Sequence, residues 1–143
     1  MLFILYKSNH HNLQYHDGQE PIVHLVANFY ESVEWAKNNS LRWVYTDTNA
    51  GTDYFNDYAD FNNLSVLDWK AIKATQWQDR DIKEKKQAEF LMEHRFPCEL
   101  IKWIGVYSSK QKYQVMNILE SVNQIKTVKV KPDWYYPNEE VFS

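Results

Sequence analysis

Residues 86–108, KQAEFLMEHRFPCELIKWIGVYS, combine two apolar runs with a proline-initiated turn. Gln87–Met92 and Ile101–Tyr107 have the length and composition of β-strands. Pro97–Leu100 lies between them and is typical of a single helical turn. The stretch therefore predicts a strand, a helical turn and a second strand in close succession.

The residues that follow predict a helix and a final strand. Ser108 and Gln111 have the spacing of a capping box, which marks a helix start. The apolar positions of this helix recur on one face: Val115, Leu119 and Val122. Thr127–Val130 then has the composition of a strand.

Working toward the N-terminus, three more strands and two helices are expected. The strands are residues 2–6, Pro21–Val26 and Leu41–Tyr45. Asn28 is expected to cap a helix with Phe29, Val33 and Ala36 on its apolar face, and Ser65 to cap another with Asp68 at its third position. This order shows no steady βαβ alternation and no glycine-rich phosphate turn, which argues against a Rossmann or P-loop protein. We expect an α+β fold, with a mixed, strongly bent sheet and flanking helices.

Length and composition fit one domain spanning residues 1–143. No apolar run approaches the roughly 18 residues that would cross a bilayer, so no membrane association is expected. A single cysteine, Cys98, fits a reducing cytoplasm. The net charge of −3 gives no overall basic face for duplex DNA. The aromatic content of 16% could serve either the core or base stacking.

Two sets of residues are weak candidates for chemistry. The histidines His10, His11, His16 and His24 match no metal-ligand spacing, and no metal site is expected. His24 lies within an expected strand and is interpreted as a core or wall residue. Cys98 has no base identifiable from sequence, so we interpret it as a small buried hydrophobe.

The stretch from Thr46 to Leu64 lacks any helical or strand period and is rich in Asn, Asp and aromatic residues. Long loops of this kind are often functional. In one interpretation its aromatic side chains pack on the core. In the other interpretation, aromatic residues stack on a nucleic-acid base while Asn or Asp contacts the edge of the base. The candidates for these contacts with DNA are Asn49, Tyr54, Phe55 and Tyr58. Phosphate attraction would then come from Lys83, Lys85 and Lys86.

Glu89 is flanked by Ala88 and Phe90, which suggests a partly buried position. A carboxylate in such a place is paired, protonated or functional. A structural ion pair with a nearby lysine or with Arg95 explains the spacing equally well.

Several segments, taken in order, resemble the DarT-type DNA ADP-ribosyltransferases. They are MLFILYKSNH (1–10), GQEPIVHL (18–25), WVYTDTNA (43–50), DYFNDYAD (53–60), LDWKAI (67–72), KQAEFLMEHRFP (86–97), ELIKWIGVYS (99–108) and KPDWYY (131–136). The resemblance covers nearly the whole chain, and it rests on the order of the segments rather than on one motif.

The resemblance implies an ADP-ribosyltransferase-like fold and transfer of ADP-ribose from NAD to thymidine in single-stranded DNA. It also implies a toxin that a macrodomain antitoxin neutralises. Glu89 corresponds to the family's catalytic glutamate, and the segment from about Asn49 to Glu89 to the loop that contacts the DNA base. The chemistry agrees, because a carboxylate can stabilise the positive charge that develops on ribose as nicotinamide leaves.

One departure from the family qualifies this expectation. In the family, a further stretch precedes the position of Met1 and carries the NAD-binding strand, the NAD-binding element and a functional arginine. No NAD-binding residue is therefore assigned here, because the family's contacts lie upstream of Met1. The chain would then be the C-terminal larger part of such a domain. The alternative function is a catalytically silent domain that binds single-stranded DNA or an antitoxin.

Overall fold

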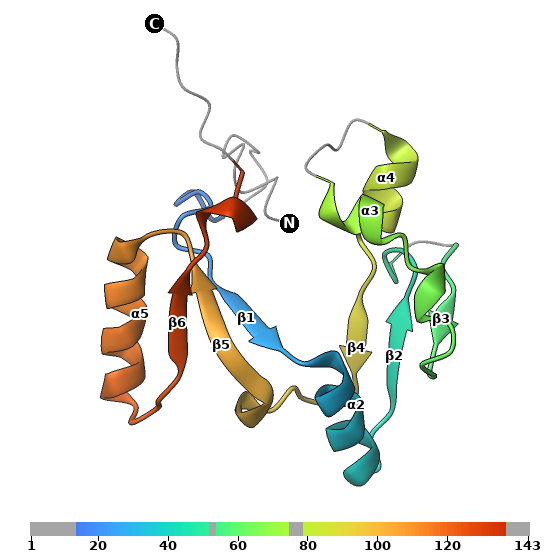
Figure 1. Ribbon diagram of the computed structural model, residues 1–143, viewed down its shortest axis with the longest axis horizontal. Coiled ribbons are helices and arrows are strands. Elements are labelled where there is room, and N and C mark those ends of the chain that lie inside the picture. Colours follow the sequence, from blue (N-terminus) through green and yellow to red (C-terminus); the bar gives the residue numbers. More distant parts are fainter. Residues whose placement is uncertain (1–13, 52–53, 75–78, 137–143) are drawn as a thin grey trace, which may run out of the picture. The chain divides into compact units, whose positions relative to one another are not determined.

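The computed structural model describes residues 14–51, 54–74 and 79–136, which form two compact units (Figure 1). One unit contains the residues up to Asn28 together with those from Pro97 onward, and the other is Phe29–Phe96. The chain therefore leaves the first unit, completes the second, and returns to the first. The expectation of one domain over the whole chain stays a prediction.

The described part of the first unit has a three-stranded sheet in the order β1-β5-β6. Its elements are β1 (His24–Ala27), β5 (Ile101–Val106), α5 (Ser109–Ser121) and β6 (Thr127–Val130). Strand β1 runs antiparallel to β5, whereas β6 runs parallel to β5. Parallel neighbours need a crossover connection, and α5 supplies it. Val115 and Leu119 of α5 pack against a core of Ile101, Ile104, Val106 and Val128.

Gly105 allows an aromatic side chain to approach this sheet closely. A Cβ atom at position 105 would lie 2.9 Å from Cζ3 of Trp134, which is closer than real carbon atoms approach. Trp134 belongs to a 3-10 turn, Pro132–Trp134, that follows β6. A glycine is thus required where the C-terminal segment crosses β5.

The described part of the second unit has an antiparallel sheet in the order β3-β2-β4. Its elements are α2 (Phe29–Asn38), β2 (Trp43–Thr46), β3 (Asp57–Tyr58), α3 (Trp69–Lys73), α4 (Arg80–Lys85) and β4 (Phe90–Met92). Its buried core consists of Val33, Ala36, Trp43 and Tyr45. Aromatic rings surround this core, and Phe29 meets Phe90, Tyr45 and Phe61 at centroid distances of 5.2, 5.9 and 6.0 Å. Much of the high aromatic content therefore serves packing in this unit.

The α+β class and the mixed strand directions are confirmed, and the described strands form two small sheets. The strand at Thr127–Val130 and the turn after Pro97 are found as expected. Ser108 caps α5, with its hydroxyl accepting from the backbone N–H of Lys110 and donating to Gln111 Oε1. The expected strand at residues 2–6 lies outside the described residues.

Several element boundaries differ from expectation. The strand expected from Pro21 begins at His24, and the strand expected from Gln87 begins at Phe90. Asp68, not Ser65, caps α3, because Ser65 lies in a 3-10 turn, Leu64–Val66. Val122 is 56% exposed, so it does not belong to the apolar face of α5.

The described helices are all too short or too polar to cross a membrane.

Candidate active site

Glu89 lies immediately before β4, where two hydrogen bonds fix its backbone. Its N–H donates to Thr46 Oγ1 at 3.1 Å, and its carbonyl accepts from the Thr46 N–H at 2.9 Å. Thr46 ends β2 and is fully buried. The position of Glu89 is therefore set by the end of the neighbouring strand.

The carboxylate of Glu89 contacts the start of the loop that follows β2. Its Oε2 accepts from the backbone N–H of Ala50 at 3.2 Å. Glu89 is exposed, so the partial burial inferred from its apolar neighbours was wrong. Among the described residues it has no ion pair with a lysine or with Arg95. The carboxylate is thus accessible and oriented by a backbone N–H.

Asn49, a candidate for base reading, makes two hydrogen bonds within the described structure. Its Oδ1 accepts from the Gly51 N–H at 2.7 Å, and its Nδ2 donates to Gln87 Oε1 at 3.0 Å. These two bonds connect the loop to the segment that leads into Glu89. In this arrangement Asn49 shapes the site around Glu89.

The three aromatic candidates of the loop lie in different environments. Tyr54 is 90% exposed and Phe55 is 40% exposed. Tyr58 lies in β3, is half-buried and stacks on Tyr45 with ring centroids 5.4 Å apart. Phe61, further along, stacks on Trp43. The loop therefore divides into an exposed first part and a second part that closes the core.

A pocket of about 340 Å³, which the sequence did not indicate, lies beside Glu89 within the second unit. Its lining is mainly aromatic and aliphatic: Phe29, Tyr30, Tyr45, Thr46, Leu64, Leu67, Trp69, Ile72, Ala88, Glu89 and Phe90. Glu89 is the one carboxylate in this lining. The lining residues come from segments distant in sequence, so local patterns could not reveal the pocket.

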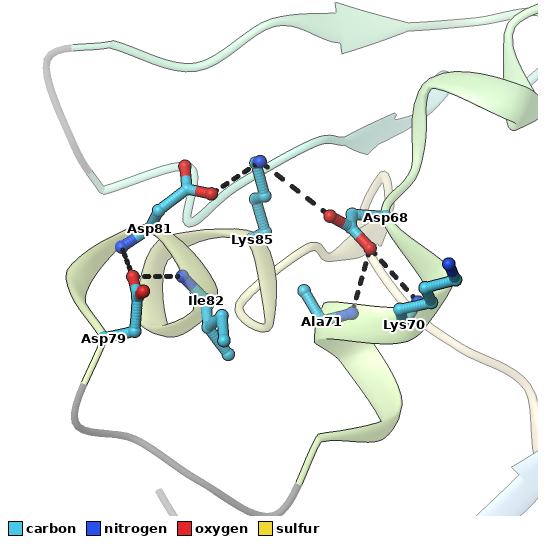
Figure 2. Close-up of polar contacts among 7 residues, drawn as sticks. All are labelled: Asp68, Lys70, Ala71, Asp79, Asp81, Ile82 and Lys85. Atoms are coloured by element: carbon cyan, nitrogen blue, oxygen red, sulfur yellow. Dashed lines mark hydrogen bonds and ion pairs between the residues drawn. The ribbon is translucent and has the colours of Figure 1, made fainter.

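Helix α3 contributes Trp69 and Ile72 to the wall of this pocket, and charged side chains of α3's cap and of α4 meet beside it (Figure 2). Asp68 caps α3 by accepting from the N–H groups of Lys70 and Ala71 at 3.1 and 2.9 Å. Lys85 Nζ lies 3.8 Å from Asp68 Oδ2 and 2.7 Å from Asp81 Oδ2. A hydrogen bond to Asp81 raises the pKa of Lys85. We call the Asp68, Lys85 and Asp81 contacts the α3–α4 latch.

The lysines after α3 have internal partners. Lys86 Nζ donates to the Ile72 carbonyl at 2.9 Å, and burial lowers the pKa of Lys86. Lys85 belongs to the α3–α4 latch. Two of the three lysines expected to attract phosphates thus serve the fold, and Lys83 is exposed.

The other sequence candidates are placed as follows. His24 packs edge-on against Trp134 and Tyr135, with centroids 5.4 and 5.0 Å away, as expected of a wall residue. Burial lowers the pKa of His24. Cys98 is exposed, so its interpretation as a buried hydrophobe was wrong. The described residues contain no cluster of three potential metal ligands, and His10 and His11 lie outside them.

A sequence profile described as "ssDNA thymidine ADP-ribosyltransferase, DarT" matches residues 1–136. The chain belongs to the DarT family. The resemblance inferred from its motifs is therefore confirmed. A DNA ADP-ribosyl transferase of Thermus sp. (strain 2.9) is 36% identical over 139 residues, covering 95% of this chain and 63% of that protein. One from Thermus aquaticus is 35% identical, covering 93% of this chain and 58% of that protein.

Solved structures of a DarT protein have the same fold. Thermus sp. 2.9 DarT in complex with ADP-ribosylated ssDNA matches with a TM-score of 0.82 at 34% identity, over 94% of this chain and 63% of that one. The complex of the same protein with NAD+ matches equally well, over 66% of that chain. The chain thus spans about three fifths of the curated relatives that it matches.

Proposed function

We propose that this chain is the glutamate-bearing part of an enzyme that transfers ADP-ribose from NAD to a thymidine base in single-stranded DNA. The observation that carries the proposal is Glu89, whose accessible carboxylate accepts from the Ala50 N–H beside an apolar pocket. Membership of the DarT family supports it, as do the NAD+ and DNA complexes of the Thermus protein.

In the proposed reaction, the bond between the ribose anomeric carbon and nicotinamide breaks, and its electron pair leaves with nicotinamide. A thymine nitrogen supplies the electron pair for the new bond to that carbon, and the proton of that nitrogen passes to solvent water. Positive charge develops on ribose between these events, as in glycoside cleavage. Glu89 would face this charge and lower the barrier electrostatically.

The rigid backbone of Glu89 suits this role. A group that stabilises a transition state acts best when its position is set before the reaction. The bonds to Thr46 set the backbone, and the Ala50 N–H orients one carboxylate oxygen. The second carboxylate oxygen makes no hydrogen bond with a described residue, which leaves it for a ribose hydroxyl.

We further propose that the protein acts in the cytoplasm as the toxin of a toxin–antitoxin pair, with a macrodomain-type antitoxin as partner. The family resemblance supports this. NAD and single-stranded DNA, the proposed substrates, are both cytoplasmic in bacteria.

Replacing Glu89 tests the catalytic role. In the longest natural chain that contains these residues, Glu89→Gln should lower transfer of ADP-ribose to an oligonucleotide by at least about 100-fold. Gln can still accept from the Ala50 N–H, so the variant removes mainly the charge. The melting temperature should stay near that of the wild type, because Glu89 is exposed and has no ion pair with a described residue.

Glu84→Gln is a matched control, because Glu84 is five residues away and pairs with Arg80 on the helix surface. It should transfer ADP-ribose at the wild-type rate. Wild-type transfer by a folded Glu89→Gln variant would contradict the proposal. A wild-type chain that binds the oligonucleotide without transferring ADP-ribose would favour the silent-domain alternative.

A further inference from the structure

The sheet face of the first unit that points away from α5 carries two tryptophans and two lysines. Val128 of β6 belongs to the core that packs under α5 (Figure 1). Because side chains alternate along a strand, Lys129 lies on the opposite face, beside its register partner Gly105 of β5. Trp103, two residues before Gly105, lies on this face too, and Trp134 crosses it at Gly105. We call this surface the lysine–tryptophan face, and its four side chains are Trp103, Trp134, Lys129 and Lys131.

Each lysine of this face is placed over an indole ring. Lys129 Nζ lies 4.5 Å from the centroid of the Trp103 ring, and Lys131 Nζ lies 5.8 Å from that of Trp134. The two indole rings contact each other, with centroids 5.1 Å apart. An ammonium group is attracted to an aromatic face, so the rings restrain both lysine side chains. The two charges are therefore positioned before any ligand binds.

The two ammonium groups follow one another along β6, which lies at the edge of its sheet. Lys131 extends the pairing with β5, because its N–H donates to the Val106 carbonyl at 2.8 Å. Residues two apart on a strand are separated by roughly 6.6 Å and point the same way. This separation is close to the distance between neighbouring phosphates of an extended nucleic-acid strand. The spacing therefore matches a phosphate backbone better than one small anion.

The positive charge of this face is not neutralised by ion pairs. Neither Lys129 nor Lys131 has an ion pair with a described residue. Residues 97–136 contain six lysines and three acidic residues, a net charge of +3, whereas the whole chain carries −3. A strand whose phosphates replace the counterions of such a surface releases those ions, which favours binding.

We propose that the lysine–tryptophan face binds the phosphate backbone of single-stranded DNA, with Lys129 and Lys131 on neighbouring phosphates. The choice of DNA rests on the proposed function, whereas the spacing and the charge are properties of the face itself. All residues of the face belong to the first unit, whereas Glu89 belongs to the second. The face adds affinity for the strand without reading its sequence, because phosphate contacts carry no base information.

Replacing both lysines tests these contacts through their salt dependence. The double substitution Lys129→Gln and Lys131→Gln removes two phosphate contacts. It should therefore reduce the slope of log affinity against log salt by about 1.4, and the affinity itself by about 20-fold at about 0.1 M salt. Fluorescence anisotropy of a short thymine oligonucleotide with the 143-residue chain, without NAD, measures both quantities. The melting temperature should stay near that of the wild type, because neither lysine has an ion pair with a described residue.

Two further double variants separate the placed charges from net charge. Lys110→Gln with Lys112→Gln removes the same charge from α5 of the same unit. These two lysines lie over no aromatic ring of the described residues and, two apart on a helix, point in different directions. This control should reduce the slope much less. Lys129→Arg with Lys131→Arg keeps both charges and should bind like the wild type. Equal losses for the two glutamine pairs would overturn the inference.

The phosphates of the ligand are tested with three probes. By NMR, an abasic DNA strand should shift the indole N–H signals of Trp103 and Trp134, because its backbone is intact. A peptide nucleic acid, which lacks phosphates, should not shift them, and neither should inorganic phosphate at the same phosphate concentration. Shifts with either of these two probes equal to those with DNA would overturn the inference, as would wild-type affinity of the Lys129→Gln and Lys131→Gln variant. Because binding is measured without NAD, the outcome is independent of the transfer test of Glu89.

Discussion

The hydroxyl of Thr46, at the end of β2, connects this strand to the start of the loop and to Glu89. Its Oγ1 donates to the carbonyl of Thr48 at 2.5 Å and accepts from the N–H of Glu89 at 3.1 Å. A hydroxyl has one donor and two acceptor sites, so this single group can serve both bonds. Because Thr46 is fully buried, the loop start and the glutamate share a rigid anchor.

The aromatic residues of the loop after β2 differ in how far they are exposed to solvent. Tyr54 is 90% exposed, whereas Tyr58 is half-buried and stacked on Tyr45. We expect Tyr54→Ala to change the free energy of unfolding by less than about 0.5 kcal/mol. We expect Tyr58→Ala to lower it by about 2 kcal/mol, because it removes a packed ring.

Oligonucleotide binding shows whether the exposed tyrosine contacts DNA. If Tyr54 stacks on a base, Tyr54→Ala should weaken binding by about 1–3 kcal/mol. Urea unfolding and fluorescence anisotropy on the same preparations provide both quantities. If Tyr54→Ala keeps both its stability and its affinity for DNA, the first part of the loop does not bind the acceptor.

At the scale of elements, α3 and α4 are too short to be stable alone and depend on their caps. Asp68 caps α3 and also faces Lys85, while Asp79 caps α4 by accepting from Asp81 and Ile82 (Figure 2). The Asp68 cap therefore stabilises the helix that carries Trp69 and Ile72 of the pocket wall.

Two substitutions separate the cap from the charge contact. Asp68→Ala removes both and should lower the melting temperature by about 3 °C. Asp68→Asn keeps a capping oxygen and should lose little, because the Lys85 contact is long and solvent-exposed. Calorimetry of both variants measures the two contributions.

The contribution of Asp68 to the stability of the fold should depend on pH. The hydrogen bond from the Ala71 N–H lowers the pKa of Asp68 in the folded state. A lowered carboxyl pKa stabilises the fold above the ordinary pKa of aspartate and loses that effect as the pH falls below it. The difference in melting temperature between the wild type and Asp68→Ala should therefore become smaller in acid. Equal melting temperatures for the wild type and Asp68→Ala at neutral pH would show that the cap contributes nothing.

Elements with complete local signals could be predicted from the sequence, and elements without them could not. The β5–α5–β6 segment has apolar runs, a serine cap and an apolar helix face within thirty residues. At α3, Ser65 and Asp68 are both good caps, and only the three-dimensional arrangement selects Asp68. Helix α4, which Asp79 caps, is not among the elements expected from the sequence.

The candidate site depends on contacts between residues that are distant in the sequence and meet within the second unit. Glu89 meets Thr46 and Ala50, about forty residues earlier, and the pocket lining extends from Phe29 to Phe90. The sequence could indicate Glu89 by resemblance, because the motif around it is local. Its exposure, its hydrogen bonds and the pocket are set by tertiary packing, which no local pattern encodes.

Each unit has its own buried core, and a matched pair of valines tests whether the cores act separately. Val33 of α2 and Val106 of β5 are both fully buried, one in each core. Val33→Ala should lower the free energy of amide opening in β2 and β4 by about 2 kcal/mol, because it removes buried methyl groups and leaves a cavity. Val106→Ala should do the same in β5 and β6.

We expect each variant to leave amide exchange in the other unit near the wild-type rate, since local units can open independently. Hydrogen exchange measured by NMR on the two variants decides this. If either substitution lowers protection equally in both sheets, the chain unfolds as one cooperative body and the two cores are not separate sources of stability.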